Sequence, residues 1–186
     1  TMILSICMIL RATDKSMQAM QAKMSSKIIA EVSDANTGIT DAEAEQIRNL
    51  PDVGFVNRIG RYEAFPSDFS PVTANASSEE DNRKVALLSY DDLEKDSPFS
   101  ELQYHLTSGG YITENTRGAV IHESLAAQNG LQIGDKLELS GENGDTVSVT
   151  ITGLFRSAGR IEDKQPAAAT AVNRIENQIF IDNETC

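Results

Sequence analysis

The stretch 118–155 constrains the fold of this 186-residue chain most, because strand, helix and turn signals follow one another closely there. It begins with the apolar residues 119–121, which suit a buried strand. A short helix over 125–128 follows, and Asn129 and Gly130 end it, since glycine readily adopts the left-handed conformation found at helix C-termini. These signals predict a strand that leads directly into a short helix.

The second half of this stretch predicts a β-hairpin. Leu137 and Leu139 alternate with polar residues, which gives a strand one apolar and one polar face. Asn143 and Gly144 then predict a type I′ turn, whose two central residues both need positive φ. The alternating residues 147–152 are expected to form the return strand.

The beginning of the chain is a different kind of segment. Residues 2–10 are almost wholly apolar, but they are too few to cross a bilayer, which takes about 20 residues. They are either the start of a buried helix or the outer end of a membrane helix, and their uniformly apolar character favours the membrane helix. High helical propensity continues over 11–24, so we expect this helix to extend outward as a stalk.

The next part of the chain predicts a strand over 27–32, a helix, and an extended segment over 53–65. Thr40 and Glu43 form a capping box, in which each side chain bonds the backbone N–H of the other residue. The helix that follows is expected to bury a stripe of three apolar side chains: Ala44, Ile47 and Leu50.

Three further elements are expected, namely a strand over 84–89, a short helix that includes Phe99, Leu102 and Leu106, and a final strand over 178–181. The segment 66–83 is rich in Ser, Asn and Pro and predicts a surface loop. The candidate partner-contact site is the part of this loop over 66–74 together with the residue before it, and its apolar residues are Phe65, Phe69 and Val72.

Charge and motifs exclude several classes of function. A net charge of −12 disfavours nucleic-acid binding, where Lys and Arg must neutralise phosphates. The sequence has no G-x-x-x-x-G-K-[ST] loop, and neither His105 nor His122 belongs to a two-histidine metal motif. Ser124 lacks the glycines of a nucleophile elbow, so we expect it to cap a helix. We therefore expect a binding or transmitting module that is not an enzyme and uses no metal or cofactor.

Two segments resemble one family. VIHESLAAQNGLQIGDKLEL, with the hairpin and VTITGLF after it, resembles the MacB-type extracytoplasmic core domain of FtsX-like ABC transporter permeases. GITDAEAEQIRNLPDV is similar to the helix after the first strand of that domain, and the two segments lie in the family's order. The resemblance implies an α+β fold with two small α/β lobes on an N-terminal stalk helix. The implied division is the membrane-helix end and stalk at 1–26, a porter-like lobe at 27–83 plus 156–186, and a smaller inserted lobe at 84–155.

The same resemblance implies a function. In such permeases a cytoplasmic ATPase drives a motion that the membrane helices convey to the extracytoplasmic domains, a process termed mechanotransmission. The implied location is the outer side of the cell membrane, with the N-terminal helix in the bilayer. The implied partners are a cytoplasmic ABC ATPase, a second permease copy or paralogue, and an extracellular peptide, lipoprotein or cell-wall hydrolase, but no nucleic acid. Two alternatives stay open: an FtsX-like activator of an extracellular cell-wall hydrolase, and a secreted enzyme.

Overall fold

The computed structural model describes residues 28–30, 38–73, 78–95, 97–113, 116–159 and 170–185. The chain divides into two compact units, 1–40 and 41–186. In the first unit, residues 28–30 and 38–40 are exposed and form neither helix nor strand, so the strand predicted over 27–32 is wrong at its described centre. The membrane-helix end and stalk predicted over 1–26 lie outside the described residues.

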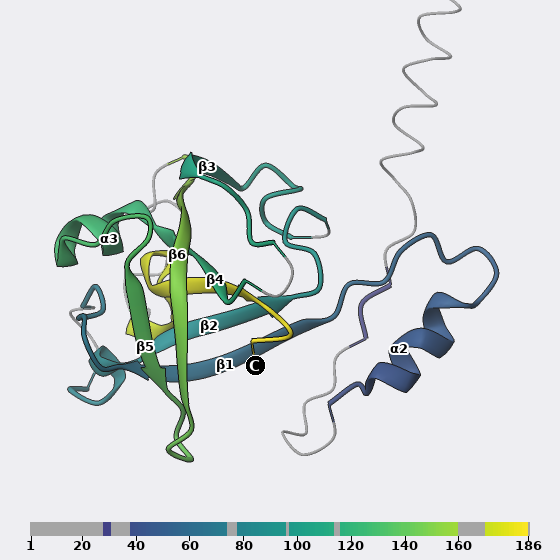
Figure 1. Cartoon of the computed structure of the whole chain (residues 1–186), viewed down its shortest axis with the longest axis horizontal. Coiled ribbons are helices and arrows are strands. Elements are labelled where there is room, and N and C mark those ends of the chain that lie inside the picture. Colours follow the sequence, from purple (N-terminus) through teal and green to yellow (C-terminus); the bar gives the residue numbers. More distant parts are fainter. Residues whose placement is uncertain are drawn as a thin grey trace, which may run out of the picture. The chain divides into compact units, whose positions relative to one another are not determined.

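The second unit is built on one sheet of seven strands, whose order is β3-β6-β4-β7-β2-β1-β5. Because β5 also pairs with β6, six of these strands close into a barrel (Figure 1). The strands are β1 (Ile59–Pro66), β2 (Val85–Tyr90), β3 (Tyr104–Gly109), β4 (Gly118–His122), β5 (Lys136–Ser140), β6 (Thr146–Ser157) and β7 (Gln178–Asp182).

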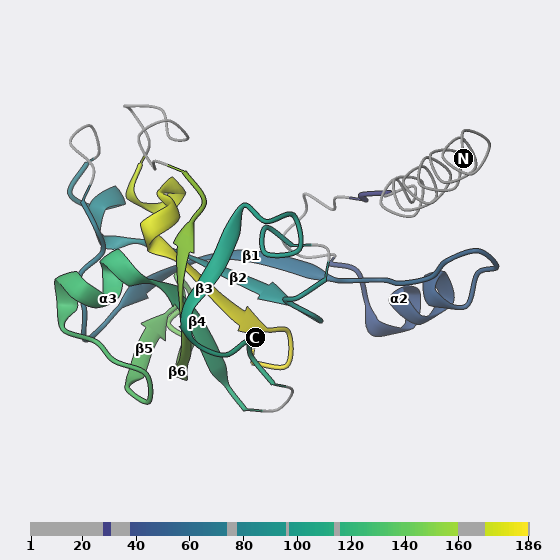
Figure 2. The same cartoon turned by 90° about the horizontal axis from the view of Figure 1, so that it is seen from above.

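The predicted α+β fold class with two lobes is wrong, because the protein is mostly β and its strands form this single barrel. The last strand, β7, lies between β2, with which it runs parallel, and β4, with which it runs antiparallel. Strands that were expected in separate lobes therefore pair with each other, as the view from above also shows (Figure 2). Closure leaves fewer unpaired edges than two small open sheets would have.

The central strands β2 and β4 are buried along their whole length, which explains their continuous apolar sequences. Side chains alternate between two apolar clusters: Ala119 and Ile121 of β4 belong to the interior cluster, and Val120 belongs to the outer cluster. Aromatic side chains dominate the outer cluster. They are Tyr90, Phe99, Tyr104, Phe155 and Phe180.

Two short α-helices lie in the described residues, α2 (Asp41–Arg48) and α3 (Glu123–Asn129). Helix α3 ends at Gly130 in the left-handed conformation (φ 67°), as predicted. The expected apolar stripe of α2 is only partly correct, because Ala44 is buried but Ile47 and Leu50 are 40% and 54% exposed.

The β5–β6 hairpin is confirmed, but its turn is not of the predicted type. A type I′ turn needs positive φ at both Asn143 and Gly144. Only Gly144 has it (φ 87°), and its N–H bonds the Gly141 carbonyl oxygen at 3.1 Å. A single glycine in the left-handed region is therefore enough to close this hairpin.

The short helix predicted through Phe99, Leu102 and Leu106 is wrong. Residues 98–102 form turns, Leu102 is 78% exposed, and β3 begins at Tyr104 and pairs with β6. Tyr104 and Leu106 both contact the outer cluster, and their spacing of two residues is the period of a strand. The tertiary contact with β6 therefore decides the conformation of this segment.

Candidate functional site

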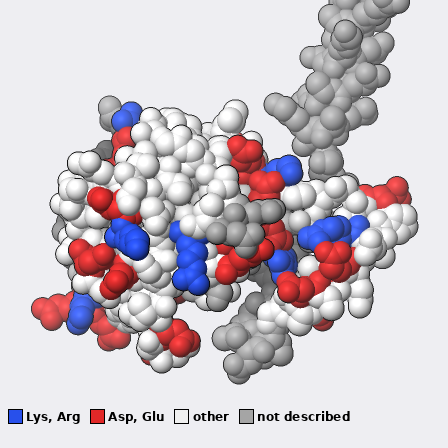
Figure 3. Space-filling model, in the orientation of Figure 1, with Lys and Arg blue, Asp and Glu red and all other residues white. Residues whose placement is uncertain are grey.

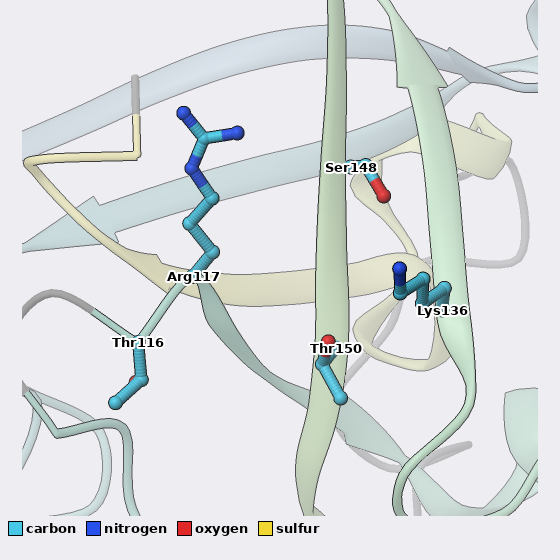
Figure 4. Close-up of a pocket in the computed structure, with 5 residues that line it drawn as sticks. All are labelled: Thr116, Arg117, Lys136, Ser148 and Thr150. Atoms are coloured by element: carbon cyan, nitrogen blue, oxygen red, sulfur yellow. The ribbon is translucent and has the colours of Figure 1, made fainter.

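A polar groove on the outer face of the barrel is the first candidate site. Thr116, Arg117, Lys136, Ser148 and Thr150 line it, and its volume is about 410 Å³ (Figure 4). Arg117 and Lys136 lie on opposite sides of β6, and the hydroxyl-bearing residues of β6 lie between them. The groove therefore presents two cationic groups and several hydroxyls to a ligand.

Strand pairing fixes the positions of these side chains. Thr150 pairs with Lys136 of β5 on one side and with Gly118 of β4 on the other. Arg117 is the residue immediately before Gly118, so its backbone lies next to this pair. The flanking residues Val149 and Ile151 belong to the interior cluster. Since alternate residues of a strand face opposite sides, Ser148 and Thr150 face outward.

The two cations of the groove differ from most described Lys and Arg residues, which contact carboxylates. On the face shown in Figure 3, basic side chains lie among acidic ones. The cations paired with carboxylates are Arg48, Arg58, Lys84, Lys95, Arg156 and Arg174. Within the described ranges, neither Arg117 nor Lys136 has a carboxylate at ion-pair distance, although Glu138 follows on the same face of β5.

A second polar arrangement joins the segment that enters the barrel to the segment that leaves it. We call Asn57, Arg58, Asp91, Asp92 and Asn183 the clasp. The Asn183 amide donates to the Arg58 carbonyl oxygen at 3.0 Å and to the Asp91 carboxylate at 2.8 Å. The Arg58 guanidinium donates to the same carboxylate at 2.9 Å, and the Asn57 amide donates to the Asp92 carbonyl oxygen at 3.0 Å.

The charges of the clasp stabilise one another. Burial raises the pKa of Asp91, but hydrogen bonds from Arg58 and Asn183 outweigh this effect and hold the pKa below its ordinary value of 3.8. The hydrogen bond to Asp91 is also the main reason that the pKa of Arg58 is raised. Both groups are therefore charged in the folded protein at neutral pH.

The candidate partner-contact residues Phe65, Phe69 and Val72 do not form an exposed apolar loop. Phe69 is 9% exposed and belongs to the interior cluster, and Val72 packs against that cluster. Phe65 is half-buried, and the Lys84 ammonium lies 5.4 Å from the centre of its ring.

Hydrogen bonds also fix the loop that carries these residues. The Asn129 amide and carbonyl groups bond the Ser70 backbone at 2.9 Å each, and the Asn177 side chain bonds both backbone groups of Val72 at 2.7 and 2.8 Å. The described part of the loop is therefore part of the domain surface.

In the described residues, no hydrogen bond joins the side chain of His105, His122 or Ser124 to the side chain of another of the three. His122 is 1% exposed, and its Nδ1 accepts the Ser124 backbone N–H at 3.1 Å, so His122 caps α3 in place of the expected Ser124. His105 lies on β3 and is exposed. Among the described residues, no group of His, Cys, Asp and Glu is arranged to hold a metal ion.

Sequence reasoning missed the groove and the clasp. In β5 and β6, apolar residues such as Leu137 and Val149 alternate with polar ones in the sequence. This alternation places Lys136 and Thr150 on an outer, polar face. Nothing in the local sequence places Arg117 beside them, because that contact depends on the parallel pairing of β4 with β6.

No described helix is both long enough and apolar enough to cross a bilayer.

Comparison with solved structures gives a structural likeness, whereas two other comparisons give none. No family model and no curated protein matches the chain. A solved domain of a protein from Porphyromonas gingivalis that is described as a permease is similar, with a TM-score of 0.37 and 16% sequence identity. The match covers 75% of this chain and 55% of that one, so this chain spans little more than half of its length.

Proposed function

We propose that this chain is a non-enzymatic extracytoplasmic domain of a permease, which follows the movements of the segments that connect it to the membrane. The observation that carries this proposal is the clasp, which ties Arg58, at the entrance of the barrel, to Asn183, at its exit. A domain inserted between two membrane helices needs its two connections side by side, a geometry that favours insertion of domains in general.

The clasp also supports a mechanical role. Displacement of either connecting segment acts on the same end of β2, because Ile59 of β1 and Asp182 of β7 both pair with Tyr90. The barrel is closed by hydrogen-bonded strands, so it moves as one body when that end is displaced. A folded cap of this kind passes motion on with little internal bending.

The finer form of the proposal is a permease of the MacB or FtsX type, in which ATP hydrolysis in the cytoplasm is coupled to export by mechanotransmission. It is supported by the sequence resemblance over 118–155, a segment that folds into β4, α3, β5 and β6 in the expected order. The proposed partners are a cytoplasmic ABC ATPase and a second permease copy. The proposed location is the outer side of the cell membrane.

The test is made on the full-length natural protein, with Cys7 and Cys186 replaced by serine and one cysteine placed at the exposed Ala127 on α3. We expect a membrane-impermeant maleimide to label Ala127→Cys in intact cells. We also expect the detergent-purified protein to bring an ABC-type ATPase with it. Labelling only after lysis, or purification without such an ATPase, would refute the proposal.

The non-enzymatic part of the proposal has its own test. We expect the purified chain to hydrolyse no ester, peptide or glycan substrate above the buffer rate. Turnover that follows the protein through purification and is lost on unfolding would contradict this part alone.

A further inference from the structure

The groove lined by Arg117 and Lys136 has the features of a ligand site, and its interpretation does not depend on the permease proposal. Its volume of about 410 Å³ falls within the ~300–1,000 Å³ typical of small-molecule sites. Its donors come from β5, from β6 and from the residues immediately before β4, and the pairing of these three strands sets the spacing of their backbones. Such a site is formed before any ligand arrives.

Electrostatics favour an anionic ligand. The chain carries a net charge of −12, and most described basic side chains are neutralised by nearby carboxylates. In the described part of the chain, Arg117 and Lys136 form no ion pair, and they lie on opposite sides of the same strand. An anion placed over β6 would lie between the two cations.

The backbone of Arg117 is held in a conformation that non-glycine residues avoid. Its φ is 47°, in the left-handed region, and its carbonyl oxygen accepts the Thr150 backbone N–H at 2.8 Å. A Cβ at the adjacent Gly118 would lie 2.9 Å from the Thr152 Cγ2 atom, so the chain is closely packed at this point. Strain of this kind is common at binding sites, where the surrounding structure maintains it.

The set of donors distinguishes between kinds of anion. The Thr116 hydroxyl already donates to the Thr113 carbonyl oxygen at 2.5 Å, which leaves the Ser148 and Thr150 hydroxyls as additional donors. A guanidinium can engage two oxygens of a carboxylate or a phosphate in a bidentate manner. A carboxylate has only two oxygens, whereas a phosphate monoester offers three terminal oxygens, which matches a guanidinium on one side and an ammonium with hydroxyls on the other.

We propose that the Arg117–Lys136 groove binds a phosphate monoester. The phosphate lies over Thr150, between the guanidinium of Arg117 and the ammonium of Lys136, and the rest of the ligand fills the remainder of the groove. The same chemistry is offered by a soluble phosphate ester and by the headgroup of phosphatidic acid, and the experiment separates these two sources.

The experiment uses the purified 186-residue chain with ¹⁵N labelling, and amide signals are followed during titration with inorganic phosphate, glycerol 3-phosphate and acetate. We expect saturable shifts at Arg117, Lys136 and Thr150 with both phosphates, and much weaker ones with acetate. We expect Lys136→Gln and Arg117→Gly each to weaken binding about tenfold, as loss of one charge-assisted contact implies. Glycine is chosen at 117 because it accepts a positive φ, so this variant keeps its fold.

The matched control is Arg83→Gln, which removes the same charge from an exposed residue outside the groove. Its affinity for phosphate should stay within about twofold of the parent value, because a distant exposed charge is screened by salt. Flotation with phosphatidylcholine vesicles, with and without phosphatidic acid, forms the second arm. Binding to phosphatidic acid that is lost in Lys136→Gln identifies a lipid phosphate, and binding of glycerol 3-phosphate alone identifies a soluble ester.

Three results would overturn the proposal. The first is the absence of saturable shifts with either phosphate in the titration and of binding to phosphatidic acid vesicles. The second is acetate binding as tight as phosphate binding. The third is an equal loss of affinity in Lys136→Gln and Arg83→Gln, which would show that only net charge matters.

Discussion

Two regions of this molecule carry equally explicit sequence signals but differ in how they bury their apolar side chains. In the segment from β4 to β6, the expected strand, helix and hairpin all form, and residues such as Leu125 and Ile151 are at most 1% exposed. In the segment around α2, the helix also forms, yet Leu50 is 54% and Phe55 is 43% exposed. Local signals such as a glycine stop therefore specify where a helix forms. Its apolar side chains are buried only where another element of the fold packs against them.

The difference in burial arises from where in the sequence the packing neighbours of each region lie. Strand β6 pairs with β5 through a short turn and with β4 through a connection that consists of α3 and β5, so this region supplies several of its own neighbours. Contacts of this kind lie close in sequence and cost little chain entropy to form. Helix α2 has only Ala44 buried, so its stability depends mainly on its own backbone hydrogen bonds.

The largest expected effect comes from truncating the outer aromatic cluster. Phe155 on β6 is 0% exposed, and its ring centre lies 5.0 Å from that of Tyr104 and 5.3 Å from that of Phe180. We expect Phe155→Ala to lower the free energy of unfolding by about 3–5 kcal/mol, because it removes buried area and leaves a cavity. Urea unfolding followed by circular dichroism measures the change.

The matched truncation in the other region is Leu50→Ala. Since Leu50 is more than half exposed, we expect a loss within about 0.5 kcal/mol. Equal losses in the two variants would mean that the apolar residues near α2 are covered in solution, and the comparison between the two regions would fail.

The next largest effect concerns the clasp. Asp91→Asn removes the charge that accepts hydrogen bonds from Arg58 and Asn183, and we expect a loss of about 2 kcal/mol at pH 7, since these bonds involve charged groups. The folded pKa of Asp91 is lowered, so its contribution is complete above pH 3.8 and is lost as the pH falls through the folded value. The stability difference between parent and variant should therefore shrink in acid.

An ion pair within α2 provides the contrast to the clasp. Glu45 and Arg48 form an exposed pair within the helix, and Glu45→Gln should cost no more than about 0.5 kcal/mol. A loss in Asp91→Asn as small as this would show that the clasp does not join the two connecting segments firmly.

A smaller effect depends on pH and arises from His122, which is buried at the junction of β4 and α3. Burial lowers its pKa below 6.5, although nearby Glu176 and Glu123 partly oppose the shift and Arg156 adds to it. A neutral ring is also needed because Nδ1 accepts the backbone N–H at the start of α3. The unfolded chain binds this proton more readily, so stability should fall as the pH drops below 6.5, with a slope of at most about 1.4 kcal/mol per pH unit.

The variant His122→Asn should remove this slope between pH 6.5 and 5, because asparagine keeps a capping oxygen but does not titrate. His105→Asn changes an exposed residue of β3 and should leave the slope as it is. Unfolding measured at several pH values tests both. A slope that persists in His122→Asn would assign the pH dependence to other groups.

The same contrast shows how much the sequence could predict. Alternation and turn residues were sufficient to locate β4, α3, β5, β6 and β7 along the chain, since these signals are contained within each segment. Closure of the barrel was not predictable in this way, because the pairing of β7 with both β2 and β4 joins residues far apart in the chain. The error at Leu102 has the same origin, since an apolar spacing compatible with a helix was overridden by the pairing of β3 with β6.

The groove was less predictable than the fold. Lys136 and Thr150 could be assigned to an outer face from their strands, but their nearness to Arg117 follows only from the registers of β6 with β4 and β5. Arg117 also departs from local rules, because a positive φ in front of a strand is expected of glycine. A residue that departs from such rules inside an otherwise regular region is where a binding role is most expected.

The smallest prediction uses this departure to compare the two regions directly. Arg117, before β4, and Asp52, after α2, both have positive φ, at 47° and 70°. Replacing Arg117 by glycine removes a strain of about 1–2 kcal/mol but adds freedom to the unfolded chain worth about 0.4–1 kcal/mol. We therefore expect Arg117→Gly to gain about 0.5 kcal/mol in stability. Asp52→Gly should gain less, because aspartate tolerates this conformation better than arginine does.

Phosphate titration then separates the two sites, since only Arg117→Gly should lose affinity for phosphate. A variant at 117 that is more stable and still binds phosphate would mean that the strained arginine has no role in the groove. One that is less stable would mean that its side chain supports the barrel itself.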